Sequence, residues 1–194
     1  MFKQKRIDYH IPLYKDRFYH IYNRSVGKDV LFYNNENYKY FLEKYSKYLD
    51  GIVNTYSFCL LPNHFHFLIS PTIEDQEQIS QQFQRFFISY SMSVNKEQER
   101  SGNLFQKNFK RKIIEDESYL KSVVYYIHAN PLHHKLRNDF ENYPYSSYQI
   151  ILSNKPTRLK RQDVIEWFGS REQFVEFHRD LKSYLFDESY AIEK

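Results

Sequence analysis

Residues 52–70 constrain the fold more than any other part of the chain. Two runs rich in β-branched, aromatic and leucine residues, 52–60 and 64–70, are separated by Leu61-Pro62-Asn63. Proline presets the backbone of a turn and asparagine tolerates its unusual angles, so this pattern is typical of a β-hairpin. It predicts that the chain is built around an antiparallel sheet.

The segments on either side of the hairpin alternate between extended and helical patterns. Further strands are predicted at residues 17–22 and 110–115. Apolar residues at helical spacing predict three helices, at residues 34–49, 77–95 and 117–130, the last ended by Pro131. The order strand–helix–strand–strand–helix–strand is that of a ferredoxin-like, split βαβ arrangement. We therefore predict an α+β fold with an antiparallel sheet of four to five strands and helices on one face.

The C-terminal part of the chain is predicted to be helical. After a Pro-Tyr-Ser-Ser turn that starts at Pro144, shorter helices are expected near residues 145–153, 162–168 and 171–186. There is no internal repeat and no low-complexity linker before them. We expect a core domain over residues 1–142 and a helical extension, residues 143–194, packed on it.

Composition excludes several classes of function. Only 4 of 194 residues are glycine, and no glycine-rich phosphate loop of a nucleotide-binding protein is present. No apolar run approaches the ~18 residues of a membrane span, and 19% aromatic residues are incompatible with wholesale disorder. The single cysteine, Cys59, rules out an intramolecular disulfide and a multi-thiolate zinc site. We expect a cytoplasmic protein with no membrane partner.

Two histidines on the second hairpin strand are candidate metal ligands. Side chains alternate between the faces of a strand, so His64 and His66 project from the same face while Phe65 and Phe67 point to the other. Two neighbouring neutral imidazoles can bind one metal ion. Because the chain has 8 histidines, a purely structural pairing stays open at this point.

The helix that precedes Pro131 carries a second candidate group. Residues four apart lie on one helical face, so Tyr126 projects with Asn130, and Ser122 extends the same stripe. Tyr125 lies on a different face. Tyr126 could be catalytic or a packing residue with a wet hydroxyl, and Asn130, which precedes a proline, could simply be a helix C-terminal residue.

The segment from residue 100 to 112 has the composition of a nucleic-acid-binding surface. It carries five basic residues and no acidic one, with two phenylalanines between them. Basic groups can follow a phosphate backbone, and exposed aromatic rings can stack on unpaired bases. The candidate DNA-binding residues are Arg100, Phe105, Lys107, Phe109, Lys110, Arg111 and Lys112. A solvated basic face is the alternative.

These motifs together resemble a known family. From about residue 14 to 185 the chain is similar to the REP-associated tyrosine transposases, a branch of the single-tyrosine transposases in the HUH endonuclease superfamily. The matching segments are YHIYNR (19–24), LPNHFHFLI (61–69), SGNLFQKNFK (101–110), YIHANP (126–131), YPYSS (143–147) and WFG (167–169). The family commonly has tryptophan where Phe105 and Tyr145 stand here.

The resemblance implies a function for each candidate. It makes His64 and His66 the metal ligands of the HUH motif, Tyr126 the nucleophile, and Asn130 the third ligand, in a catalytic core that spans residues 1–142. The implied activity is that of a metal-dependent single-stranded DNA endonuclease and strand transferase, which cleaves hairpin or repeat elements through a 5′-phosphotyrosine. Mg²⁺ or Mn²⁺ is the expected cofactor, and single-stranded or hairpin DNA the expected partner.

Two other interpretations of the residues stay open. The first is a ferredoxin-like domain that binds nucleic acid without catalysis. The second is a hydrolase in which His64, His66 and His128 hold zinc and water attacks the substrate. The sequence leaves both a monomer and a homodimer open.

Overall fold

The computed structural model describes residues 11–27 and 29–184. Four strands form one antiparallel sheet in the order β2-β3-β1-β4. Their bounds are β1 (Phe18–Arg24), β2 (Val53–Leu61), β3 (His64–Pro71) and β4 (Lys110–Ile114). Strands β2 and β3 are the predicted hairpin, and its turn contains Pro62 and Asn63. The α+β class with a four-stranded antiparallel sheet is therefore confirmed.

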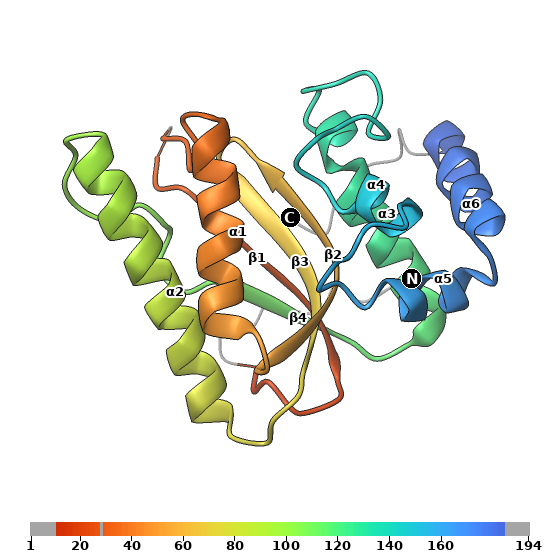
Figure 1. Cartoon of the computed structure of the whole chain (residues 1–194), viewed down its shortest axis with the longest axis horizontal. Helices are drawn as coiled ribbons and strands as arrows, with labels where there is room; N and C mark the ends of the chain where they lie inside the picture. Colours follow the sequence, from red (N-terminus) through yellow and green to blue (C-terminus); the bar gives the residue numbers. More distant parts are fainter. Residues whose placement is uncertain (1–10, 28, 185–194) are drawn as a thin grey trace, which may run out of the picture.

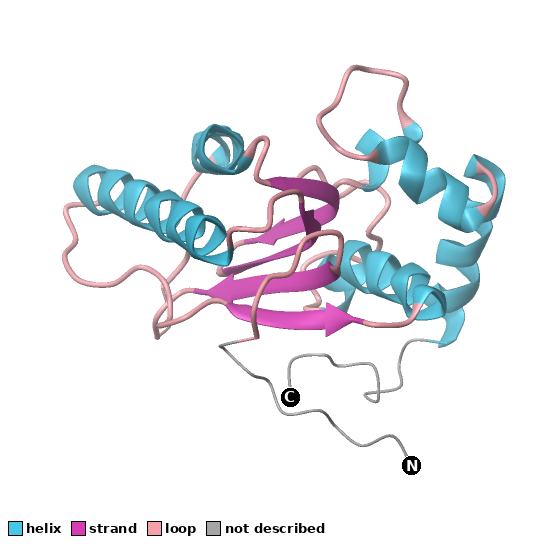
Figure 2. Cartoon of the chain, turned by 90° about the horizontal axis from the view of Figure 1, so that it is seen from below, coloured by secondary structure: helices cyan, strands magenta, loops and turns pink. Residues whose placement is uncertain are grey.

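Helices cover both faces of the sheet (Figures 1 and 2). On one face lie α1 (Asn35–Leu49) and α2 (Gln76–Glu97); on the other lie α3 (Glu117–His133), α4 (Tyr148–Leu152), α5 (Arg161–Phe168) and α6 (Arg171–Tyr184). The prediction that helices lie on one face of the sheet is right for α1 and α2. It is wrong for α3, which lies on the opposite face. Strand β3 is buried along its whole length, so its two faces each require a helical cover.

Each face of the sheet has its own apolar core. Phe67 of β3 packs in the first core with Phe41 of α1 and Phe86 of α2. In the second core Leu68 of β3 and Ile127 of α3 join Phe174 of α6 and other residues of the C-terminal helices. The predicted domain boundary at residues 142/143 stays a prediction, and residues on both sides of it share this second core.

Helix α3 extends past its proline. Pro131 lies inside the helix, which ends at His133, so the prediction that Pro131 terminates it is corrected. Proline lacks the N–H that would bond to the carbonyl four residues earlier. Here that loss falls in the last turn, and the N–H of His134 still donates to the carbonyl of Asn130 (3.0 Å). One missing bond so close to the end does not stop the helix.

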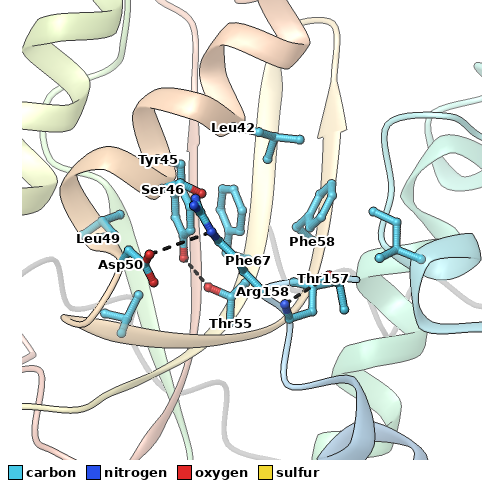
Figure 3. Close-up of a pocket in the computed structure, with 13 residues that line it drawn as sticks. Leu42, Tyr45, Ser46, Leu49, Asp50, Thr55, Phe58, Phe67, Thr157 and Arg158 are labelled. Carbon is cyan, nitrogen blue, oxygen red and sulfur yellow. Dashed lines mark hydrogen bonds and ion pairs between the residues drawn. The ribbon is translucent and has the colours of Figure 1, made fainter. Parts of the chain in front are cut away.

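A small cavity opens beside α1, on the face of the sheet that carries Phe67 (Figure 3). It has a volume of about 180 Å³ and lies between α1, β2 and the loop before α5. Tyr45 Oη and Thr55 Oγ1 are 2.7 Å apart in its wall, and Arg158 forms an ion pair with Asp50 at its rim. The cavity is therefore separate from the histidine face.

None of the described helices is long and apolar enough to cross a membrane.

Two buried histidines join α3 to α6. His128 Nδ1 and His178 Nε2 are 3.0 Å apart, and both side chains are fully buried. Burial lowers the pKa of His178 to about 3 and holds the pKa of His128 well below its ordinary value. Both imidazoles are therefore neutral in the folded protein.

We expect the protein to lose stability in acid because of this pair. In the unfolded chain the imidazoles bind protons below about pH 6.5, whereas in the folded chain they stay neutral. The stabilisation is complete above that pH and is lost as the pH falls toward the folded-state value. Urea unfolding at about pH 7.5 and pH 4.5 measures it. His178→Gln, which does not titrate, should show a smaller decrease, and an equal decrease would contradict this explanation.

Candidate active site

His64 and His66 lie side by side on the face of the sheet that α3 covers. In the β1–β3 register Arg24 is opposite His64, and Tyr22 is opposite His66. Both histidines are buried, with 4% and 0% of their surface exposed. Their ring centroids are 5.2 Å apart. Strand alternation therefore places the two imidazoles together, as the sequence predicts.

Tyr126 faces this histidine pair from α3. Its ring centroid is 5.8 Å from that of His66 and 5.9 Å from that of His20, and in both cases the rings meet edge to face. Tyr125 points elsewhere, into the second core, where it packs against Phe140 and His178. Burial raises the pKa of the Tyr125 hydroxyl. Of the two adjacent tyrosines, only Tyr126 contacts His66 and His20.

Asn130 is fully buried one turn after Tyr126. Its Nδ2 donates to the carbonyl of Tyr126 at 2.8 Å. Its Oδ1 is buried and accepts no hydrogen bond within the described structure. A buried carbonyl oxygen without a donor is costly, and a cation is one group that could satisfy it.

His20 is a site residue that the sequence analysis did not identify. Its Nε2 is 2.9 Å from His66 Nδ1, and its ring is stacked on His66 and on Tyr22. The signal was available: His20 and Tyr22 alternate on β1, and a ferredoxin-like order places β1 beside β3. The contact fixes the orientation of the His66 ring.

The end of α3 adds two more imidazoles. His134 Nε2 is 3.1 Å from His64 Nε2, while His64 Nδ1 is 2.6 Å from Asn63 Oδ1. His133 packs against Tyr126, with ring centroids 5.6 Å apart. Its pKa is lowered, first by burial and then by the neighbouring His134 and His66. The site is thus rich in nitrogen donors.

The chemistry of the three candidate ligands, His64, His66 and Asn130, is compatible with a divalent metal ion. Among the described residues, no group of three or more His, Cys, Asp or Glu side chains is arranged to hold a metal. The predicted metal ligands are not such a group, because they are two imidazoles and one amide oxygen. The unpartnered Oδ1 of Asn130 is the observation that supports them. Nitrogen and amide oxygen ligands are compatible with Mn²⁺ or Mg²⁺.

The basic segment divides between the two faces of the sheet. Lys110 and Lys112 are opposite Tyr22 and His20 in the β1–β4 register and so share the histidine face. Lys110 Nζ lies 5.4 Å from the centroid of the Tyr22 ring. Arg111 points to the other face, with its guanidinium 4.4 Å from the centroid of a phenylalanine ring. Two of the strand's three cations therefore border the candidate site.

The remaining two basic residues of the segment lie in loops. Arg100 forms an ion pair with Asp29 and donates to Asn95 Oδ1 at 2.9 Å. Lys107 is exposed. Arg100 is thus held by partners within the chain, whereas Lys107 faces solvent.

The aromatic residues of this segment are not a stacking surface. Phe105 and Phe109 are buried, with 8% and 9% of their surface exposed. Both pack on Phe87 of α2, with ring centroids 5.1 and 5.5 Å apart. The expectation that these rings stack on DNA bases is therefore wrong. They fill the first core, because the loop before β4 crosses the apolar side of α2.

His128 does not join His64 and His66. Its ring nitrogens are 3.0 Å from His178 Nε2 and 2.7 Å from Ser147 Oγ. Both partners belong to the C-terminal helical part. A zinc site made of His64, His66 and His128 is therefore not supported.

Comparison with known proteins agrees with the resemblance seen in the sequence. A Haemophilus influenzae protein named as a putative REP-associated tyrosine transposase is 29% identical over 102 residues, which cover 48% of this chain and 58% of the relative. The match thus spans less than two thirds of that relative's length. No model of a protein family matches the chain.

A solved structure has the same fold. It is that of a REP-associated tyrosine transposase bound to a REP hairpin, with a TM-score of 0.64 and 16% identity over 77% of this chain and 88% of that one. The resemblance to REP-associated tyrosine transposases is thus confirmed in sequence and in fold.

Proposed function

We propose that the chain is a metal-dependent single-stranded DNA endonuclease and strand transferase that uses Tyr126 as its nucleophile. The observation that carries the proposal is the packing of Tyr126 against His66, with Tyr125 turned into the core. A phenol, two imidazoles and a buried amide oxygen on facing elements form a set that suits phosphoryl transfer.

His64, His66 and Asn130 would hold the metal ion. When bound, Mg²⁺ or Mn²⁺ would polarise the scissile phosphate and neutralise its developing charge. His66 Nδ1 is engaged with His20, so Nε2 is the His66 nitrogen assigned to the metal. At His64, a metal on Nε2 would replace or rearrange the contact with His134.

Tyr126 would attack the phosphorus atom through Oη. The Tyr126 hydroxyl gives up its proton as the new Oη–P bond forms and the bond from phosphorus to the 3′ oxygen breaks, and the departing oxygen takes up a proton to become a 3′-hydroxyl. The DNA 5′ end is then joined to Tyr126 as a phosphotyrosine. Since the phosphodiester energy is kept in this link, a 3′-hydroxyl of another strand can reverse the step and complete strand transfer.

The proposed substrate is single-stranded or hairpin DNA in the cytoplasm. The solved structure of similar fold is bound to a REP hairpin, and Lys110 and Lys112 border the site here. Lysine ammonium groups on a strand next to the nucleophile can hold the phosphates on either side of the cleaved bond.

A covalent-adduct assay tests the proposal. The protein is incubated with a labelled hairpin oligonucleotide that has single-stranded flanks, with Mn²⁺ or Mg²⁺ or with a chelator. We expect a metal-dependent protein–DNA adduct that survives denaturing electrophoresis. Binding without cleavage would indicate a binding domain, and cleavage without an adduct would indicate attack by water.

Replacing Lys110 and Lys112 together by alanine is expected to weaken hairpin binding. For a single strand, removing one lysine–phosphate interaction reduces the steepness of log affinity against log salt by about 0.7. Titrations at several salt concentrations measure both effects. Arg85→Ala, an exposed change on α2, is the control and should change neither. Equal decreases in both variants would contradict a specific role for the two lysines.

A further inference from the structure

A continuous chain of buried hydrogen bonds runs through the back of α3. Ser147 Oγ is 2.8 Å from the backbone N of Phe58 in β2 and 2.7 Å from His128 Nε2. His128 Nδ1 is 3.0 Å from His178 Nε2, and His178 Nδ1 is 2.7 Å from the carbonyl oxygen of Phe174. The three polar side chains are fully buried. The chain thus links β2, α3 and α6.

The two ends fix the direction of every bond. The carbonyl of Phe174 can only accept, so His178 carries its proton on Nδ1 and its Nε2 accepts from His128 Nδ1–H. His128 Nε2 then accepts from the Ser147 hydroxyl at 2.7 Å, a shorter contact than the 3.2 Å from the same hydroxyl to the carbonyl of Phe58, and Ser147 Oγ accepts from the N–H of Phe58. Every member is satisfied with both imidazoles neutral. This agrees with the lowered pKa of His128 and of His178.

His128 lies midway between Tyr126 and Asn130 along α3. Helical residues advance by about 100° each, so a residue two positions away lies on nearly the opposite side of the helix. The ring of His128 therefore holds the side of α3 that faces away from the candidate site. Any rotation of α3 about its axis would move Tyr126 and break the bonds of His128 at the same time.

We propose that His128, held between Ser147 and His178, is a positioning residue that sets the rotation of α3 and thereby aims Tyr126 at the histidine pair. The inference rests on the proposed function. Apolar contacts alone are non-directional, whereas hydrogen bonds to both ring nitrogens fix an orientation. The C-terminal helices then contribute to the reaction by holding α3 in position.

Ser147→Ala is the main test. It removes one hydroxyl, which leaves His128 Nε2 and the Phe58 N–H without their partner and deletes little volume. We expect the single-turnover rate of adduct formation to fall about tenfold, because small misplacements of reacting groups are costly. The dissociation constant for hairpin DNA should stay within about twofold, because the hydroxyl is buried away from the basic strand.

Two controls separate positioning from a general decrease in stability. Ser146→Ala changes a neighbouring buried serine that does not contact His128, and Ile151→Val loosens the same apolar core. Rates are measured well below the melting temperature of each variant, which circular dichroism determines. Both control variants should form the adduct at the wild-type rate. Ile151→Val should do so even if its melting temperature falls as much as that of Ser147→Ala.

Changes at His178 provide a second test that does not depend on Ser147→Ala being folded. His178→Gln keeps an acceptor near the position of Nε2 and should retain most of the rate, whereas His178→Leu should slow the reaction as much as Ser147→Ala. A wild-type rate in both Ser147→Ala and His178→Leu, or an equal decrease in Ile151→Val, would overturn the positioning role. If the wild-type protein itself forms no adduct, the proposed function fails instead.

Discussion

Tyr126→Phe is expected to eliminate the covalent protein–DNA adduct, with a decrease of at least ~10³-fold in its rate of formation. The substitution removes only the Oη that would form the bond to phosphorus and leaves the ring that packs against His66 and His20. Its effect on stability should stay below about 1.5 kcal/mol, the usual worth of one hydrogen bond. Quantified adduct on denaturing gels gives the rate.

Tyr125→Phe is the matched control for this prediction. The Tyr125 hydroxyl is buried and has no hydrogen-bond partner in the described structure, so removing it relieves an unsatisfied polar group. We expect adduct formation within a few-fold of wild type and an unchanged or higher melting temperature. Absence of the adduct in Tyr125→Phe with retention in Tyr126→Phe would reverse the assignment.

His66→Ala is expected to have the second-largest effect, a decrease of about 10²-fold or more in metal-dependent cleavage. His66 lies against Tyr126 and is oriented by His20. His64→Ala should act in the same direction, and the double variant should be inactive. The affinity for Mn²⁺ should decrease in parallel with activity. The electron paramagnetic resonance signal of the free ion measures this affinity.

The control for His66→Ala is the affinity for hairpin DNA measured without metal. It should change little, because the imidazole is assigned to the ion and not to the DNA. Full activity of the double variant at limiting metal concentration would contradict the metal site.

The features that follow a local period could be predicted from the sequence. The hairpin follows from the turn residues between two extended runs, and the shared face of His64 and His66 depends only on strand alternation. The pairing of Tyr126 with Asn130, and its separation from Tyr125, depend only on the helical repeat. These relations need no knowledge of the rest of the molecule.

The features that depend on distant segments could not be predicted in this way. Phe105 and Phe109 stand among basic residues, as aromatic residues of a nucleic-acid-binding surface do, but only the position of α2 shows that both rings are buried. His20 reaches His66 through the cross-strand register, which a single strand pattern does not contain. The partner of His128 is 50 residues away on α6.

Mapping the covalent link tests the central claim most directly. Trypsin is expected to release residues 122–135 as one peptide that contains both Tyr125 and Tyr126. After incubation with a hairpin oligonucleotide and Mn²⁺ and digestion of the bound DNA, fragmentation in a mass spectrometer locates the modified residue. We predict a 5′-phosphonucleotide on Tyr126. A nucleotide on Tyr125 or on any residue outside this peptide would contradict the account.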